Sequence, residues 1–70
     1  MKVFAIISIA RQVDGEYVIC KVEKAFTSAN KADEEAKKLA RNYAETISTP
    51  SGSIQCVCER GVFEIDVIES

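Results

Sequence analysis

The chain has 70 residues, 47% hydrophobic and 29% charged, which is the composition of one small globular domain. Nine basic and eleven acidic residues give a net charge of −2, without the basic excess typical of a general nucleic-acid binder. The sequence contains no histidine, which excludes the commonest general base and every Ser-His or Cys-His nucleophile pair. Composition therefore predicts a single non-enzymatic domain over residues 1–70.

The N-terminal third predicts a β-hairpin. Strands over about residues 2–12 and 16–26 flank Asp14-Gly15, a dipeptide typical of two-residue turns because Gly accepts positive φ at little cost. The apolar pairs that this turn sets on one face are Ile7 with Val22, Ile9 with Cys20 and Val3 with Phe26. The same face also pairs Ala5 with Lys24 and Arg11 with Val18, and a β-bulge near Lys24, or a lysine at the margin of the sheet, accommodates the mismatch.

Two features predict a cytoplasmic chain. The apolar run after Lys2 is short for a signal peptide and far too short for a membrane span, and its β-branched content favours a strand. Three cysteines are an odd number, and we expect Cys20, Cys56 and Cys58 to be reduced and to face the core as small hydrophobes. We expect no membrane partner.

Residues 27–46 have the period of an amphipathic helix, with Thr27 or Ser28 as the N-cap. The apolar arc consists of Ala29, Ala32, Ala36, Leu39, Ala40, Tyr43, Ala44 and Ile47. Five alanines in this arc predict a helix that lies close against the sheet. The helix is expected to end before Pro50, in a turn over residues 49–52.

The C-terminal part alternates apolar and polar residues on both sides of Arg60-Gly61. If these two residues form the turn, a second hairpin is predicted. The cross-strand pairs are then Cys58 with Phe63, Cys56 with Ile65 and Ile54 with Val67.

These elements predict an α+β fold, β-β-α-β-β, with a four-stranded, mainly antiparallel sheet and one amphipathic helix packed on one face. A right-handed crossover favours the strand order 2-1-3-4. The alternative order places the fourth strand beside the first.

No residue set predicts catalysis, a cofactor or a metal. The carboxylates belong to the first turns of the helix or to a solvated strand face, and the glycines are isolated turn residues. Without histidine, three cysteines cannot complete a four-ligand zinc site unless a carboxylate or a second chain contributes.

The face of the first hairpin that points away from the helix is too apolar for ordinary solvent. A single sheet with one helix leaves its other face bare, and an apolar patch there is typical of a protein partner or a homodimer. The expected partner-binding residues are Phe4, Ile6, Ala10, Tyr17, Ile19 and Lys21. The alternatives are scattered surface hydrophobes, association of edge strands, single-stranded nucleic acid stacking on Phe4 and Tyr17, or a small ligand-binding protein or enzyme.

The opening run Met1 to Ile7, the Asp-Gly turn and the alanine-rich helix with Lys31-Ala32-Asp33-Glu34 resemble short β-β-α-β proteins of bacteria and their phages. Some phage-encoded inhibitors, including certain anti-CRISPR proteins, are similar in size and layout. This resemblance implies inhibition of a protein partner and carries over no functional residue.

Overall fold

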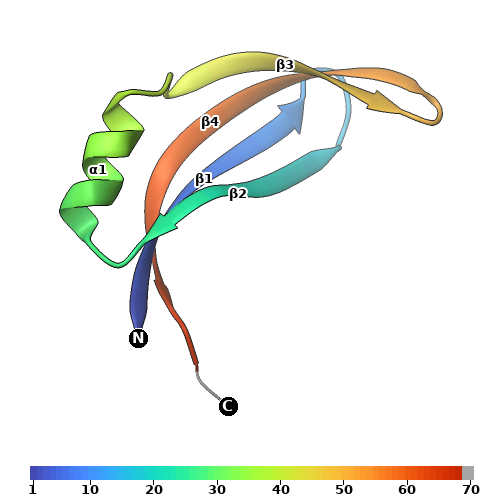
Figure 1. Cartoon of the computed structure of the whole chain (residues 1–70). Coiled ribbons are helices and arrows are strands. Elements are labelled where there is room, and N and C mark those ends of the chain that lie inside the picture. The colour runs from blue at the N-terminus through green and yellow to red at the C-terminus, as the bar shows by residue number, and fades with distance from the viewer. Residues whose placement is uncertain (69–70) are drawn as a thin grey trace.

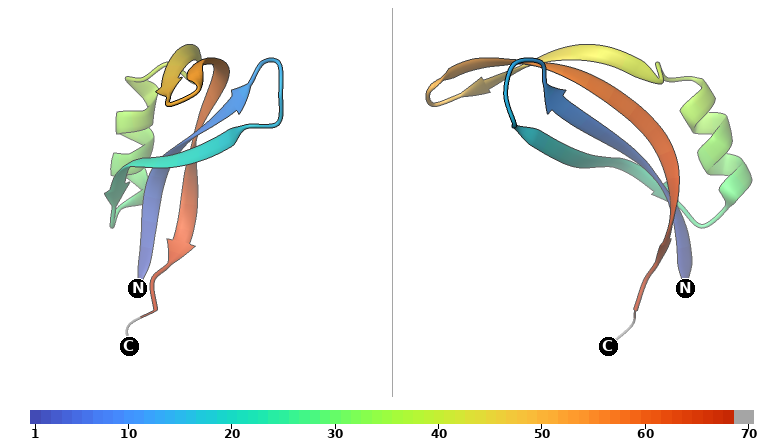
Figure 2. Two further views of the ribbon diagram at one scale, coloured as in Figure 1. Left: turned by 90° about the vertical axis from the view of Figure 1, so that its right-hand side faces the viewer. Right: turned by 180° about the vertical axis from the view of Figure 1, so that it is seen from behind.

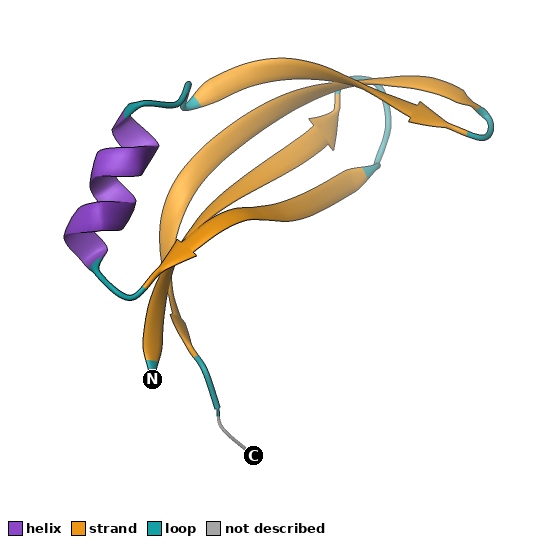
Figure 3. Cartoon of the chain, viewed as in Figure 1, coloured by secondary structure: helices purple, strands orange, loops and turns teal. Residues whose placement is uncertain are grey.

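A four-stranded antiparallel sheet and one short helix make up the computed structural model, which describes residues 1–68. The elements in chain order are β1 (Lys2–Gln12), β2 (Val18–Phe26), α1 (Ala29–Lys37), β3 (Asn42–Thr49) and β4 (Gly52–Asp66). The strands lie in the order β2-β1-β4-β3, and the sheet bends into an arch with α1 outside one end of it (Figures 1 and 3). The last two positions of the predicted domain lie outside the described residues.

The first hairpin turns at Asp14-Gly15 as predicted, but through a loop over residues 13–17 instead of a two-residue turn, and it keeps the predicted register next to that loop. Ile7 pairs with Val22 and Ile9 with Cys20. A register shift then falls between Ile6 and Ile7, so that Ile6 pairs with Lys24. The irregularity expected near Lys24 is present, and it moves Phe26 opposite Phe4 instead of the predicted Val3.

The helix is shorter than predicted. It begins at the N-cap Ser28, whose Oγ accepts a hydrogen bond from the Lys31 amide at 3.4 Å, and it ends at the C-cap Lys38. Residues 42–46, predicted to be the last helical turns, lie in β3 instead. β3 contains one Tyr, one Ile and two Thr, which prefer strands, and pairing with β4 outweighs its helical period.

The second predicted hairpin is wrong. Residues 52–66 are one continuous strand, so Cys58 does not pair with Phe63. Gly61 lacks a positive φ, and the Phe63 ring lies over the place where a side chain at this position would stand. The turn at residues 49–52 exists as predicted, with Gly52 at φ +128°, but it joins β3 directly to β4.

The predicted strand order, 2-1-3-4, is wrong as well. β4 is long enough to pair with all of β1 on one side and, through its first half, with β3 on the other. A strand paired on both edges must be interior, which gives β2-β1-β4-β3. The alternative prediction also placed the last strand beside the first. In that prediction, however, the last strand was only the segment after Gly61, which is the C-terminal part of β4.

The two faces of the sheet are exchanged relative to the prediction. The helix contacts β1, β4 and β2 on the face that carries Phe4, Ile6 and Lys24, here called the helix-side face. Ile6 is fully enclosed there, and Ala32 of α1 is the buried helical residue. The other face, here called the helix-free face, carries Ile7, Val22 and Ile65, which were predicted to lie beneath the helix.

Figure 2 shows that α1 covers only one end of the sheet, beside the β1 and β4 termini, and that the β3–β4 hairpin extends away from it. Ala10, Cys56 and Cys58 form a second buried cluster near that hairpin, packed by Tyr43 and Ile47. Among residues 1–68, no helix has the length and apolar character needed to span a membrane.

Candidate interaction surface

The helix-free face presents consecutive rows of apolar side chains across β2, β1 and β4. Cross-strand pairing sets each row, because residues directly opposite one another in an antiparallel ladder point to the same face. The rows are Val3 with Ile65; Ala25, Ala5 and Phe63; Val22, Ile7 and Gly61; and Cys20, Ile9 and Glu59. We call the nine side chains of these rows other than Gly61 and Glu59 the open patch.

Solvent reaches much of the open patch. Val22 is 59% exposed, Phe63 44% and Ile65 36%, while Ile7 and Ile9 are half-buried between their neighbours. β-Branched and aromatic side chains packed across strands are typical of a sheet face that is covered by another layer. Among the described residues, no element of the chain covers this one (Figures 1 and 2).

Charge is confined to one end of this surface. Glu59 stands in the fourth row, and Arg11 lies in the next row, between Val18 and Val57. Farther along the hairpin the same face becomes polar, and Thr46 Oγ1 donates to Gln55 Oε1 at 3.1 Å. The open patch is therefore an uncharged area with a charged and polar border on its β3–β4 side.

Five of the six residues predicted to bind a partner lie on the helix-side face, and Tyr17 lies in the loop just before β2. Ile6 and Ala10 are buried, at 0% and 5% exposure, so the expectation that they form a surface is wrong. Phe4 is half-buried, whereas Tyr17 and Ile19 remain 38% and 42% exposed and Lys21 is exposed. The error has one cause: the helix covers the opposite face from the one assumed.

The predicted stacking platform is not assembled. Phe4 pairs with Phe26 at one end of the hairpin, while the Tyr17 amide donates to the Gln12 side chain at the other end. The two aromatic residues are separated by roughly 25 Å along β1. A single base or dinucleotide does not reach both.

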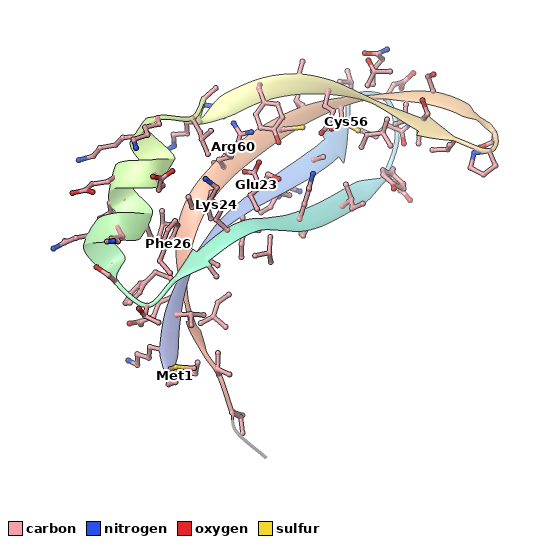
Figure 4. The ribbon with its side chains drawn as sticks, in the orientation of Figure 1. Met1, Glu23, Lys24, Phe26, Cys56 and Arg60 are labelled. Atoms are coloured by element: carbon pink, nitrogen blue, oxygen red, sulfur yellow. The ribbon has the colours of Figure 1, made fainter. Side chains whose placement is uncertain are left out.

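The helix-side face contains an ion-pair cluster that the sequence did not reveal. Arg60 Nε donates to Glu23 Oε2 at 2.6 Å, and Arg60 Nη2 donates to Glu23 Oε1 at 3.2 Å, which is a bidentate geometry. Figure 4 shows the two side chains. The pair links β4 to β2 across β1, where the buried Ser8 lies opposite Arg60. A small residue at position 8 leaves room for two long side chains above it.

Two further contacts orient the Arg60 guanidinium. Its Nη1 donates to the Ala40 carbonyl oxygen at 2.7 Å, just after α1, and its Cζ lies 4.2 Å from the centroid of the Tyr43 ring. Arg60 thus joins the helix C-terminus, β2 and β3 to β4. Among buried side-chain N and O atoms of the described residues, none lacks a hydrogen-bond partner.

Electrostatics at this cluster favours the charged pair. The Arg60 hydrogen bonds hold the pKa of Glu23 below its ordinary value, and the same bonds raise the pKa of Arg60. Burial raises the pKa of the nearby Cys58 thiol, whose Sγ donates to Glu45 Oε2 at 3.7 Å. A thiol held in its protonated form is a weak nucleophile, so these contacts are those of a structural cluster.

The three cysteines are free and fall into two environments. Cys56 and Cys58 are buried at 1% and 3% exposure, as expected. Cys20 is exposed in the open patch, although it was expected to face the core. Within residues 1–68, no group of three or more Cys, Asp or Glu side chains is placed to hold a metal ion.

A shallow cavity of about 480 Å³ lies between α1 and the edge of β4. Asp33 and Lys37 border it on the helix side, and Arg60, Gly61 and Val62 on the strand side. The Arg60 guanidinium is already engaged by Glu23 and the Ala40 carbonyl, so it does not offer free donors to a ligand there.

Comparison with known proteins identifies no relative of this chain. The sequence matches no protein-family model, and neither curated proteins nor solved structures contain a significantly similar chain. The open patch and the Arg60 cluster are therefore the features from which function has to be inferred. Alternation along β1 indicated an apolar face, but only the position of the helix identifies which face stays open.

Proposed function

We propose that this chain is a non-enzymatic protein-interaction domain that binds through the open patch. One observation carries the proposal: an uncharged area of the sheet, continuous over three strands, holds Val22 at 59% and Phe63 at 44% exposure. Apolar areas of this kind on small domains usually mark protein interaction sites. The proposal keeps the predicted mode of action and moves it to the opposite face.

The distribution of charge and shape supports the same function. The charged and polar residues of the helix-free face stand at one side of the patch, as the polar border of an interface does. α1 lies on the outer side of the bend of the sheet (Figure 1). The open patch belongs to the other face, so an incoming surface meets strands and not the helix.

Site-specific photo-crosslinking in cells tests this function. A photoreactive benzoylphenylalanine replaces Val22 in the patch or, as the control, Val13 in the β1–β2 loop, which is 64% exposed. We expect irradiation to produce a discrete crosslinked protein band from position 22 and none from position 13. Equal products from both positions, or none from either, would contradict an interaction through this face.

A further inference from the structure

We infer that the partner of the open patch is a second copy of this chain, packed face to face as a two-fold symmetric dimer. This inference rests on the proposed function and names its partner. In the dimer the two sheets form the inner layers and the two α1 helices lie outside, because each helix is on the far side of its own sheet.

The first argument is the area that the single chain leaves in water. Its accessible surface is 5288 Å². Monomeric proteins of 7.7 kDa are expected to expose about 4,300 Å², so the excess is about 1,000 Å². A standard protein interface removes about 800 Å² from each partner, so the excess of the whole chain is large enough to include one such interface.

The second argument is the shape of the chain. Its radius of gyration is 14.1 Å and its smallest extent is 16 Å. A globular chain of this length has a radius of gyration of about 11 Å. The chain is thus one thin layer over much of its length, and a second sheet packed on the helix-free face supplies the missing layer of an ordinary domain.

The third argument is charge. Two copies of a face repel each other when that face carries a net charge. Here Arg11 and Glu59 are the only charged residues in the five rows of this face, and they cancel. The open patch is therefore compatible with itself, as a two-fold interface requires.

The fourth argument is the small size of the internal core. Ile6 and Cys56 are the largest fully buried side chains among the described residues. A domain of this length is only marginally stable on its own core, and oligomerisation is a common remedy. A second copy is available wherever the chain is made.

Sedimentation velocity of the purified chain at several concentrations tests the dimer. We expect the wild-type mass to rise to twice 7.7 kDa. Val22→Lys places a charge in the interface and should raise the dissociation constant at least about tenfold. Val13→Lys is the matched control, because Val13 is equally exposed but lies in the loop, and its dissociation constant should be unchanged.

Thiol reactivity gives a second readout that needs no substitution. Cys20 is exposed in the patch, while Cys56 and Cys58 are buried. We expect one fast-reacting thiol per chain in dilute wild-type protein, slowed at least about tenfold when the dimer forms, because a covered thiol is not attacked. In Val22→Lys, Cys20 should stay fast at high concentration.

Each outcome decides between the proposals. A monomer at every concentration, with Cys20 always fast, overturns the dimer; a photo-crosslinked band of another mass from position 22 then still supports the interaction function. A dimer whose Cys20 stays fast, or which Val22→Lys leaves intact, forms through another surface and also overturns the inference.

Discussion

The two faces of the sheet do not follow the usual rule that the more apolar face is the covered one. The helix-side face is built at its centre from small and polar residues, with Ser8, Ala10 and the Glu23–Arg60 pair, yet it is the covered one. The helix-free face carries Val22, Ile7 and Phe63 and is open. Covered and apolar are therefore not the same property in a domain this small, since long charged side chains can cover a face as a helix does.

The two faces also differ in what covers their large side chains. Ile6 is enclosed on the helix-side face, and the small Ser8 leaves room there for the Arg60 side chain, whereas Val22 and Phe63 lie where no described part of the same chain covers them. On the covered face, substitutions that change side-chain volume should lower the stability of the fold, because the side chains there are closely packed. On the open face, substitutions should change the stability of the isolated chain little, but they should weaken its association.

The largest expected effect comes from the covered face. Ile6→Ala removes a fully buried side chain and should lower the free energy of unfolding by about 2–5 kcal/mol. Val22→Ala on the open face should lower it by less than about 1 kcal/mol when measured in dilute protein. Urea denaturation of both variants checks the pair, and equal losses would show that the two faces are buried alike.

Removal of the Arg60 guanidinium should come next. Arg60→Ala leaves the Glu23 carboxylate, whose side chain is only 21% exposed, without its partner, and it also frees the Ala40 carbonyl. We expect a clear loss of stability in urea denaturation. Lys38→Ala is the control: it breaks an exposed ion pair with Glu35 and should change stability little.

A double-mutant cycle with Glu23→Ala separates the ion pair from the other Arg60 contacts. The loss caused by Arg60→Ala should be smaller when Glu23 is already absent. Additive losses would mean that the Tyr43 and Ala40 contacts, not the ion pair, hold this face together.

Acid should weaken the covered face specifically. The hydrogen bonds from Arg60 lower the pKa of Glu23 from its ordinary value of 4.5 in the folded chain, so this group stabilises the fold above pH 4.5 and the contribution is lost as pH falls below it. The Glu23→Gln variant should lose less stability over that pH range. The pKa of Glu35 is lowered by Lys38 and Lys24, which leaves a pH dependence common to both proteins. Identical pH profiles of the two proteins would refute the role of Glu23.

The smallest effect on stability is expected at the N-terminus of α1, the helix that covers only one of the two faces. Ser28→Ala removes the side-chain cap on the Lys31 amide and should lower the free energy of unfolding by about 0.5–1 kcal/mol. Ser28→Asp, which keeps an acceptor, should retain most of the stability. Thermal unfolding by circular dichroism measures both, and equal loss in the two variants would argue against a capping role.

Local signals predicted the N-terminal hairpin well and the C-terminal half poorly. Asp14-Gly15 sets the register of Ile7 with Val22 because turn chemistry acts between neighbours in sequence. Arg60-Gly61 has similar turn chemistry and lies inside a strand. The Phe63 ring over Gly61 and pairing of β4 on both edges decide that outcome, and neither is local.

The candidate site shows the same limit. Alternation along β1 defined two sets of side chains, Phe4 to Ala10 and Val3 to Ile9, but it did not say which set α1 would cover. Residues 42–49 satisfied a helical period and a strand period, and the Glu23–Arg60 pair joins positions far apart in the chain. No spacing in the sequence marks such a pair.

By itself the sequence determined the first turn, the N-cap of the helix, the turn before β4 and the apolar character of alternate strand positions, because each depends on bonded neighbours or on the two-residue period of a strand. Only the tertiary structure decided the strand order, the length of β4 and the face that stays open. Those depend on which distant segments pair and on which side a nine-residue helix packs, and a one-residue bulge near Lys24 is enough to move Phe26 to the face opposite Val3.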